Sequence, residues 1–235
     1  MKKDKRKEWR MVFVPIIAYV LIMSLFENLN TGGSLENCKV CVTGVLLVLL
    51  GLYTLKSQKK GTYRFMPTES LQWKKLLFLL PMIVISTANL WHGDISFDVS
   101  VDTVLYMISM VCIGFIEELL FRGYLLQYLQ RHVAKRAVQI CGFTFGLGHI
   151  VNLMNGADVY STILQIIYAV AIGYMLSVFV VKTGHILPCC VFHATFNALS
   201  VFTNEVVITR NSETLFGALL TALSIGYGVY LNKRV

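Results

Sequence analysis

Apolar residues occur along this chain in long runs that are separated by short polar segments. Several runs approach the roughly 17–25 residues that a membrane-spanning helix requires. The eight runs cover residues 11–27, 40–55, 75–91, 102–129, 137–153, 159–181, 185–202 and 214–231. This pattern predicts an all-α fold, a polytopic membrane helical bundle with about eight transmembrane helices.

Charge supports this interpretation and orients the bundle. Only 14% of the 235 residues are charged and 56% are hydrophobic, whereas soluble domains carry roughly a quarter charged residues. With eight crossings, all but three of the 21 Lys and Arg residues fall on one side of the membrane: Lys39 and Arg210 fall on the other, and Arg122 lies within it. Basic segments stay inside, so the N- and C-termini are predicted to be cytoplasmic. The net charge of +8 thus has a topological role, and we expect no nucleic-acid partner.

The chain is expected to form a single membrane domain over residues 1–235. The basic N-terminal stretch and the apolar run after it resemble a signal peptide, but no small-residue cleavage site follows, which indicates an uncleaved first span. The six cysteines are scattered and form neither a disulfide framework nor a zinc-binding pattern.

Three charged residues interrupt the fourth run, whose residues 113–126 read IGFIEELLFRGYLL. An ionised side chain at mid-bilayer costs at least ~2.5–3.5 kcal/mol, so compensation is needed. Glu118 and Arg122 are four residues apart and are predicted to form an ion pair on one helix face. Glu117 is rotated by about 100° from Glu118, and Gly114, one turn earlier, is expected to leave space beside it. Glu117 is therefore a candidate for chemistry, although the cluster could also serve only to lock helices together.

Two later runs carry further polar residues at helical spacing. The fifth contains Phe145 and His149, together with a GxxxG pair, Gly142 and Gly146, that allows close helix contact. The seventh contains His193 and Asn197 on one face. Pro188 precedes them and is expected to kink or start that helix. A carboxylate, two imidazoles and a carboxamide could converge at one depth, an assembly suited to hydrolysis.

These residues resemble the CPBP family, named for CAAX proteases and bacteriocin-processing enzymes and also called the Abi family. Type II CAAX prenyl endopeptidases belong to it. The family pattern EExxxR, FxxxH and HxxxN is matched, in order and on separate runs, by EELLFR from Glu117, FGLGH ending at His149 and HATFN from His193. The motif-bearing core spans about residues 102–202.

The resemblance implies an intramembrane endopeptidase in a multi-pass protein, expected in a bacterial plasma membrane. Its implied substrate is a membrane-associated or prenylated peptide, and its other partner is membrane lipid. Glu117 would be the general base, aided by His149, while His193 and Asn197 would stabilise the oxyanion. Supporting roles would fall to Glu118, Arg122 and Phe145.

Three alternatives stay open at this level. Zinc could be bound by Glu117, His149 and His193, but no HExxH motif is present, so a mechanism that requires no cofactor is favoured. The fold could instead serve as a non-catalytic binding protein, such as a bacteriocin-immunity or scaffold factor. A transporter is a weaker alternative, because the sequence shows no inverted repeat. Substrate identity and oligomeric state are not predicted.

Overall fold

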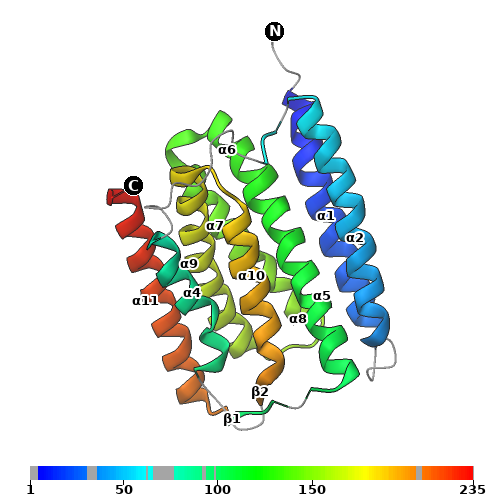
Figure 1. Ribbon diagram of the computed structural model, residues 1–235, viewed down its shortest axis with the longest axis vertical. Helices are drawn as coiled ribbons and strands as arrows, with labels where there is room; N and C mark the ends of the chain where they lie inside the picture. Colours follow the sequence, from blue (N-terminus) through cyan, green and yellow to red (C-terminus); the bar gives the residue numbers. More distant parts are fainter. Residues whose placement is uncertain are drawn as a thin grey trace.

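The computed structural model is a bundle of roughly parallel and antiparallel helices (Figure 1). It describes residues 5–30, 36–61, 63–65, 77–91, 94–97, 99–204 and 208–234. The main helices are α1 (Lys5–Leu29), α2 (Glu36–Lys59), α4 (Leu80–Ser86), α5 (Val101–Glu118), α6 (Leu126–His132), α7 (Ala137–Leu147), α8 (Val151–Met154), α9 (Val159–Thr183), α10 (Leu187–Leu199) and α11 (Arg210–Arg234). A π-helix (Leu119–Leu125) joins α5 to α6, and two short strands, β1 (Asp94–Ile95) and β2 (Thr203–Asn204), pair antiparallel.

Six helical segments among the described residues are long and apolar enough to cross a membrane. Continuous helical winding through the π-helix makes the α5–α6 segment the longest of them, at 32 residues. The chain is therefore an integral, multi-pass membrane protein with an all-α bundle, as the hydrophobic pattern predicts. The six segments are Arg6–Leu29, Cys38–Lys59, Val101–His132, Ala134–Met154, Val159–Thr183 and Arg210–Arg234.

The other two predicted spans are shorter than expected. The run at 185–202 forms the helical segment Leu187–Phe202. In the run at 75–91, residues 75 and 76 lie outside the described residues, and the rest forms α4 with a 3₁₀ turn on each side. Both α4 and α10 carry a proline, Pro81 and Pro188, in their first turn. A proline ring fits the first turn of a helix and disfavours further helix on its N-terminal side. The prediction of eight full spans is thus corrected to six long helices and two short ones, and Pro188 starts its helix.

Successive spans alternate in direction along the bundle, with α5–α6 and α7–α8 each forming one span (Figure 1). In that view α1 begins at the upper end and α11 finishes there, while β1 and β2 pair at the lower end. The last turns of α2 and α11 place basic residues at the upper end, in agreement with the predicted segregation of charge. With the two short helices included, an even number of passes brings both terminal helix ends to the same side.

α9 is the central helix of the bundle. Half of its most apolar 18-residue window is buried, compared with 11% for α1 and for α2. α9 packs extensively on α7 and on α11, whereas α1 and α2 lie together at one edge (Figure 1). The apolar side chains that α1 and α2 expose are suited to lipid, so their hydrophobicity reflects the membrane and not a protein core.

The predicted glycine pair brings α7 and α9 into close contact. A Cβ atom on Gly142 would lie 2.6 Å from the backbone nitrogen of Tyr174, and one on Gly146 would lie 2.6 Å from the backbone nitrogen of Val170. Gly173 of α9 faces Gly142 at the same crossing. The close contact expected from the GxxxG pair is confirmed, and it fixes α7, which carries Phe145, against the centre of the bundle.

The arrangement of helix ends predicts the topology in the membrane. Reporter fusions placed after residues 65, 133 and 235 should report a cytoplasmic position, since these points follow or lie within the basic upper end. Fusions after residues 96 and 206 should report the opposite side, because β1 and β2, which precede these two points in the chain, pair at the lower end. Activity of alkaline phosphatase and fluorescence of a cytoplasmic reporter at each point provide the measurement. Reversal at any one position would contradict the eight-pass arrangement.

Candidate active site

The helix that carries the two glutamates changes its winding immediately after them. α5 ends at Glu118, and the π-helix Leu119–Leu125 follows before α6 resumes regular winding. Such widened turns leave carbonyl groups without their usual partners and occur frequently at functional sites. Here the Cys141 thiol of α7 donates to the backbone carbonyl of Phe121, at 3.3 Å. α7 is therefore attached to the site helix at its irregular turn.

The predicted ion pair between Glu118 and Arg122 is confirmed. Nη1 of Arg122 donates to Oε1 of Glu118 at 2.8 Å, and neither side chain has any solvent exposure. The guanidinium carbon also lies 4.3 Å from the centroid of the Phe145 ring, a cation–π contact. Burial of two opposite charges is tolerable only with such close pairing and hydrogen bonding, so these three side chains form one unit.

His193 lies between the two carboxylates. Its Nδ1 atom is 2.9 Å from Oε1 of Glu118, and its Nε2 atom is 3.3 Å from Oε2 of Glu117. Glu118 thus contacts both Arg122 and His193, and it links the first and third motifs of the sequence. Because both nitrogens of the ring face carboxylates, the orientation of His193 is fixed from two sides.

Gly114 makes this arrangement possible, in a different way from the sequence interpretation. A Cβ atom at this position would lie 2.7 Å from the backbone nitrogen of Ala194 and 3.0 Å from the backbone carbon of His193. The space beside Gly114 is therefore filled by the backbone of α10, and it is not open space beside Glu117. The glycine lets α10 approach α5 closely enough for His193 to reach both glutamates.

Glu117 has a further partner that sequence reasoning missed. The hydroxyl group of Tyr19, in the middle of α1, donates to Oε1 of Glu117 at 2.9 Å. The Glu117 side chain keeps 15% exposure, while Glu118 has none. A tyrosine in the middle of an apolar run, away from the membrane interface where this residue is usual, was the available signal. α1 thereby orients the more exposed of the two carboxylates.

Phe145 holds the two histidines in place. Its ring makes edge-to-face contacts with His149, with ring centroids 5.7 Å apart, and with His193, at 5.4 Å. The ring of Phe121 contacts it from the π-helix at 5.1 Å. Edge-to-face contacts fix ring orientation as well as position. Phe145 thus contacts a residue from each of the three motifs: Arg122, His149 and His193.

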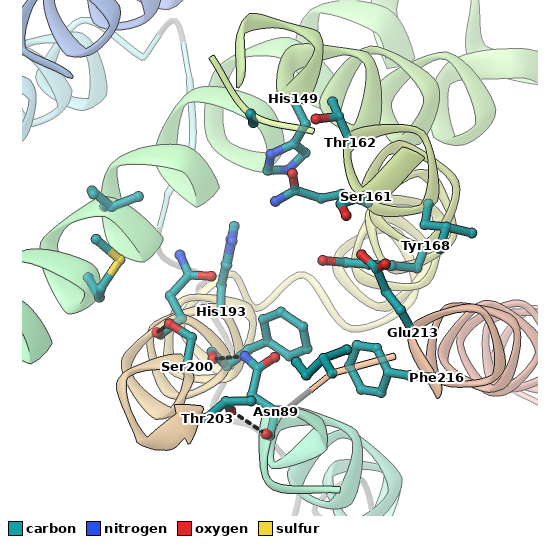
Figure 2. A pocket seen from close by; sticks show the side chains of 18 of the residues that line it. Asn89, His149, Ser161, Thr162, Tyr168, His193, Ser200, Thr203, Glu213 and Phe216 are labelled. Atoms are coloured by element: carbon teal, nitrogen blue, oxygen red, sulfur yellow. Dashed lines mark hydrogen bonds between the residues drawn. The ribbon is translucent and has the colours of Figure 1, made fainter. Parts of the chain in front are cut away.

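A cavity of about 650 Å³ adjoins these residues (Figure 2). Glu117, His149, His193 and Asn197 all contribute to its wall. Figure 2 shows His149 and His193 directed toward the same open space from different helices. Within the described residues, no hydrogen bond engages the ring of His149 or the carboxamide of Asn197. These two groups can therefore offer donors to a molecule in the cavity.

Comparison with known proteins agrees with this geometry. The family model of the Rce1-like type II CAAX prenyl endopeptidases matches residues 99–199. Over this region the chain is similar to the CAAX protease (CPBP) family. The matched residues include all three motifs and every helix that places a motif residue at the site. No curated protein matches the chain.

Zinc binding would place strict demands on the geometry of this site. A ligand set of Glu117, His149 and His193 would need all three donor atoms about 2.0–2.2 Å from one centre. Among the residues that the structure describes, no group of three or more His, Cys, Asp or Glu side chains is arranged to hold a metal ion. Both ring nitrogens of His193 also face carboxylate oxygens. The residues as arranged do not fit a zinc ion.

The wall of the cavity contains polar residues that carry no motif signal. Hydroxyl and amide groups from α5, α9, β2 and the 3₁₀ turns after α4 and after α10 lie along it. Asn89 is held by two hydrogen bonds: its side chain donates to the Phe196 carbonyl at 2.6 Å, and its own carbonyl accepts from the Thr203 hydroxyl at 2.6 Å (Figure 2). Only the packing of distant helices reveals this set: Asn89, Tyr106, Ser161, Thr162, Gln165, Ser200 and Thr203.

Substitution of the two glutamates should separate folding from function. Glu118→Gln leaves the buried Arg122 without its ionic partner, and removing one member of a buried pair costs about 3–5 kcal/mol. The melting temperature in detergent should fall by on the order of 10 °C. Glu117→Gln is the matched control, because Glu117 is partly exposed and a glutamine can still accept from Tyr19. Equal melting temperatures for the two variants would contradict this division.

Proposed function

We propose that this protein is an intramembrane endopeptidase that hydrolyses a peptide bond of a membrane-associated peptide with water activated by Glu117. One observation carries the proposal. Glu117 is a carboxylate partly exposed to a cavity inside the membrane-spanning bundle, while its partners Glu118 and His193 are buried and hydrogen-bonded. The similarity of residues 99–199 to a protease family supports the same reaction class.

The reaction begins with proton transfer to Glu117. A water molecule in the cavity gives a proton to Oε2 of Glu117 as its oxygen attacks the carbonyl carbon of the peptide bond. The new C–O bond converts the carbonyl into a tetrahedral oxyanion. When the C–N bond breaks, Glu117 returns the proton to the leaving amine, so the enzyme ends in its starting state. Tyr19 and His193 hold the carboxylate in place for both transfers.

Asn197 and His149 are the groups best suited to stabilise the oxyanion. Preorganised donors directed at developing charge are worth several kcal/mol when water is excluded. The resemblance implies that His193 has this role and that His149 assists the base. The contacts favour the reverse, because both nitrogens of His193 already face carboxylates whereas His149 lines the cavity. His193, held by Glu118, then belongs with the base.

Cleavage of peptide pools by purified protein tests the proposed activity. Random peptides are incubated with the wild type and with Glu117→Gln in detergent, and products are identified by mass spectrometry. The wild type should cut a subset, and Glu117→Gln should be slower by roughly 10²-fold or more because it cannot accept the proton. Equal rates would remove Glu117 from the mechanism. If neither protein cuts any peptide but both retain a binding partner, a non-catalytic binding function replaces the enzyme.

Chelation tests whether the reaction is independent of metal. Because a carboxylate can activate water without a Lewis acid, we expect the initial rate on a cleaved peptide to be unchanged after exhaustive treatment with a chelator. Metal content by mass spectrometry of the treated protein serves as the control for removal. Loss of the rate, with recovery by zinc but not by magnesium, would overturn the proposed role of Glu117 as base.

A further inference from the structure

The cavity beside Glu117 extends to the lower end of the bundle. Along α5 it is lined by residues three or four apart, which form one helix face: Tyr106, Met110, Ile113 and Glu117. Its other end is bordered by Asp158 just before α9, Thr203 of β2 and Glu213 in the first turn of α11. Those elements lie at the lower end in Figure 1. A molecule that enters by this route reaches Glu117 from the lower end.

The lower end is the side opposite the basic residues. Among the described residues, it carries the basic side chains Lys39 and Arg210, and Lys39 forms an ion pair with Glu27 at 2.6 Å. The other described Lys and Arg residues outside the bilayer interior lie at the upper end. Since basic segments remain in the cytoplasm, the mouth of the cavity faces the non-cytoplasmic side.

The wall of the cavity is acidic. Glu117, Asp158 and Glu213 line it, and none of the described residues that line it is a lysine or an arginine. The carboxylate of Glu213 projects from α11 toward the open space (Figure 2). The backbone N–H of Ser161 donates to Asp158 at 3.0 Å and holds the pKa of that carboxyl below its usual range, so Asp158 is ionised at neutral pH.

Two described cations lie close to residues of this wall. Nζ of Lys39, which is paired with Glu27, lies 5.8 Å from the centroid of the Tyr106 ring. The guanidinium carbon of Arg210 lies 5.2 Å from the centroid of the Tyr160 ring, and its charge acts on Asp158. It offsets part of the charge of Asp158, whereas Glu213 and Glu117 are left to set the sign of the cavity interior.

We propose that the cavity binds a cationic peptide segment, bearing lysine, arginine or a free amino group, which enters from the non-cytoplasmic side. The proposal rests on the peptidase function proposed above and adds the substrate class and the side of entry. Ionised carboxylates on a partly enclosed wall attract cationic groups and repel anionic ones. Hydroxyl and amide groups between the mouth and Glu117 can accept hydrogen bonds from the peptide backbone as it approaches the base.

The same wall disfavours a free C-terminal carboxylate. A protease that cuts close to a chain terminus must neutralise the terminal carboxylate, and the described lining residues include no Lys or Arg for that purpose. A lipidated protein on the cytoplasmic surface would also be on the wrong side of the bundle. The prenylated substrate implied by the family resemblance is therefore the less favoured of the two.

Peptide pools of matched charge test the substrate class. Three random pools differ only at two fixed central residues, which are both Lys, both Gln or both Glu. We expect the wild type to cut the Lys pool at least about tenfold faster than the Glu pool. The double variant Asp158→Asn, Glu213→Gln should lower this ratio of cleavage rates at least about threefold. Asparagine retains the helix cap at 158. Asp102→Asn, exposed at the same end but outside the wall, is the matched control and should keep the wild-type ratio.

The outcomes separate this inference from the proposed function. Cleavage of all three pools at equal rates would overturn the cationic preference and leave the peptidase function standing. If no pool is cut, the peptidase function fails, and a binding measurement decides the inference. In the variant Ser200→Cys, the Lys pool, but not the Glu pool, should then protect the new thiol from reaction with a maleimide. Equal protection by both pools would overturn it.

Thiol labelling tests the side of entry. In a background with the exposed Cys38 and Cys41 replaced by serine, Ser200→Cys should react with a membrane-impermeant maleimide in intact cells. Lys60→Cys, exposed at the upper end, should react only in inverted vesicles and serves as the control. Reaction of Ser200→Cys only in inverted vesicles would place the mouth in the cytoplasm and overturn the proposed route.

Discussion

Glu118 is the residue on which the site depends, because its carboxylate is shared by Arg122 and His193 with no solvent to replace either partner. An ionised group in this position is stable only while both contacts are made. α5 and α10 must therefore keep one relative position, and the imidazole must keep one orientation. Glu117 is the adjacent residue on α5, so its backbone is held in the same position, while its side chain is partly exposed to the cavity.

Glycines determine how closely the helices approach. Gly114 admits the backbone of α10, and Gly142 with Gly173 joins α7 to α9. Without a hydrophobic driving force inside lipid, helices associate through such close packing and through polar contacts. The contacts of Phe145 with both histidines follow from these two crossings. Packing and charge pairing thus determine the same geometry, and neither would suffice alone.

The position of Glu117, the proposed base, bears on how water would reach it inside a membrane protein. Glu117 lies deep in the bundle, and the polar wall that leads to it begins at Asp158 and Glu213, near the lower end. This wall can conduct water and hydrogen-bond a peptide backbone, whereas the exposed faces of α1 and α2 are suited to lipid. The acidic residues of the wall are the basis for the proposed cationic substrate, and their position near the lower end is the basis for its proposed entry from the non-cytoplasmic side.

The sequence alone determined the helical class, the segregation of basic residues and the Glu118–Arg122 pair, because each depends on local spacing or on the cost of charge in a bilayer. The proximity of motifs on three runs was predicted from depth along each helix, and the cavity wall bears it out. The partners of each atom were not predictable: Tyr19 on Glu117, His193 between two carboxylates and α10 in the space beside Gly114. The end of the bundle toward which the cavity extends could not be predicted from the sequence either. Rotation and crossing of helices decide these features, and both are set by packing between segments that are far apart in the sequence.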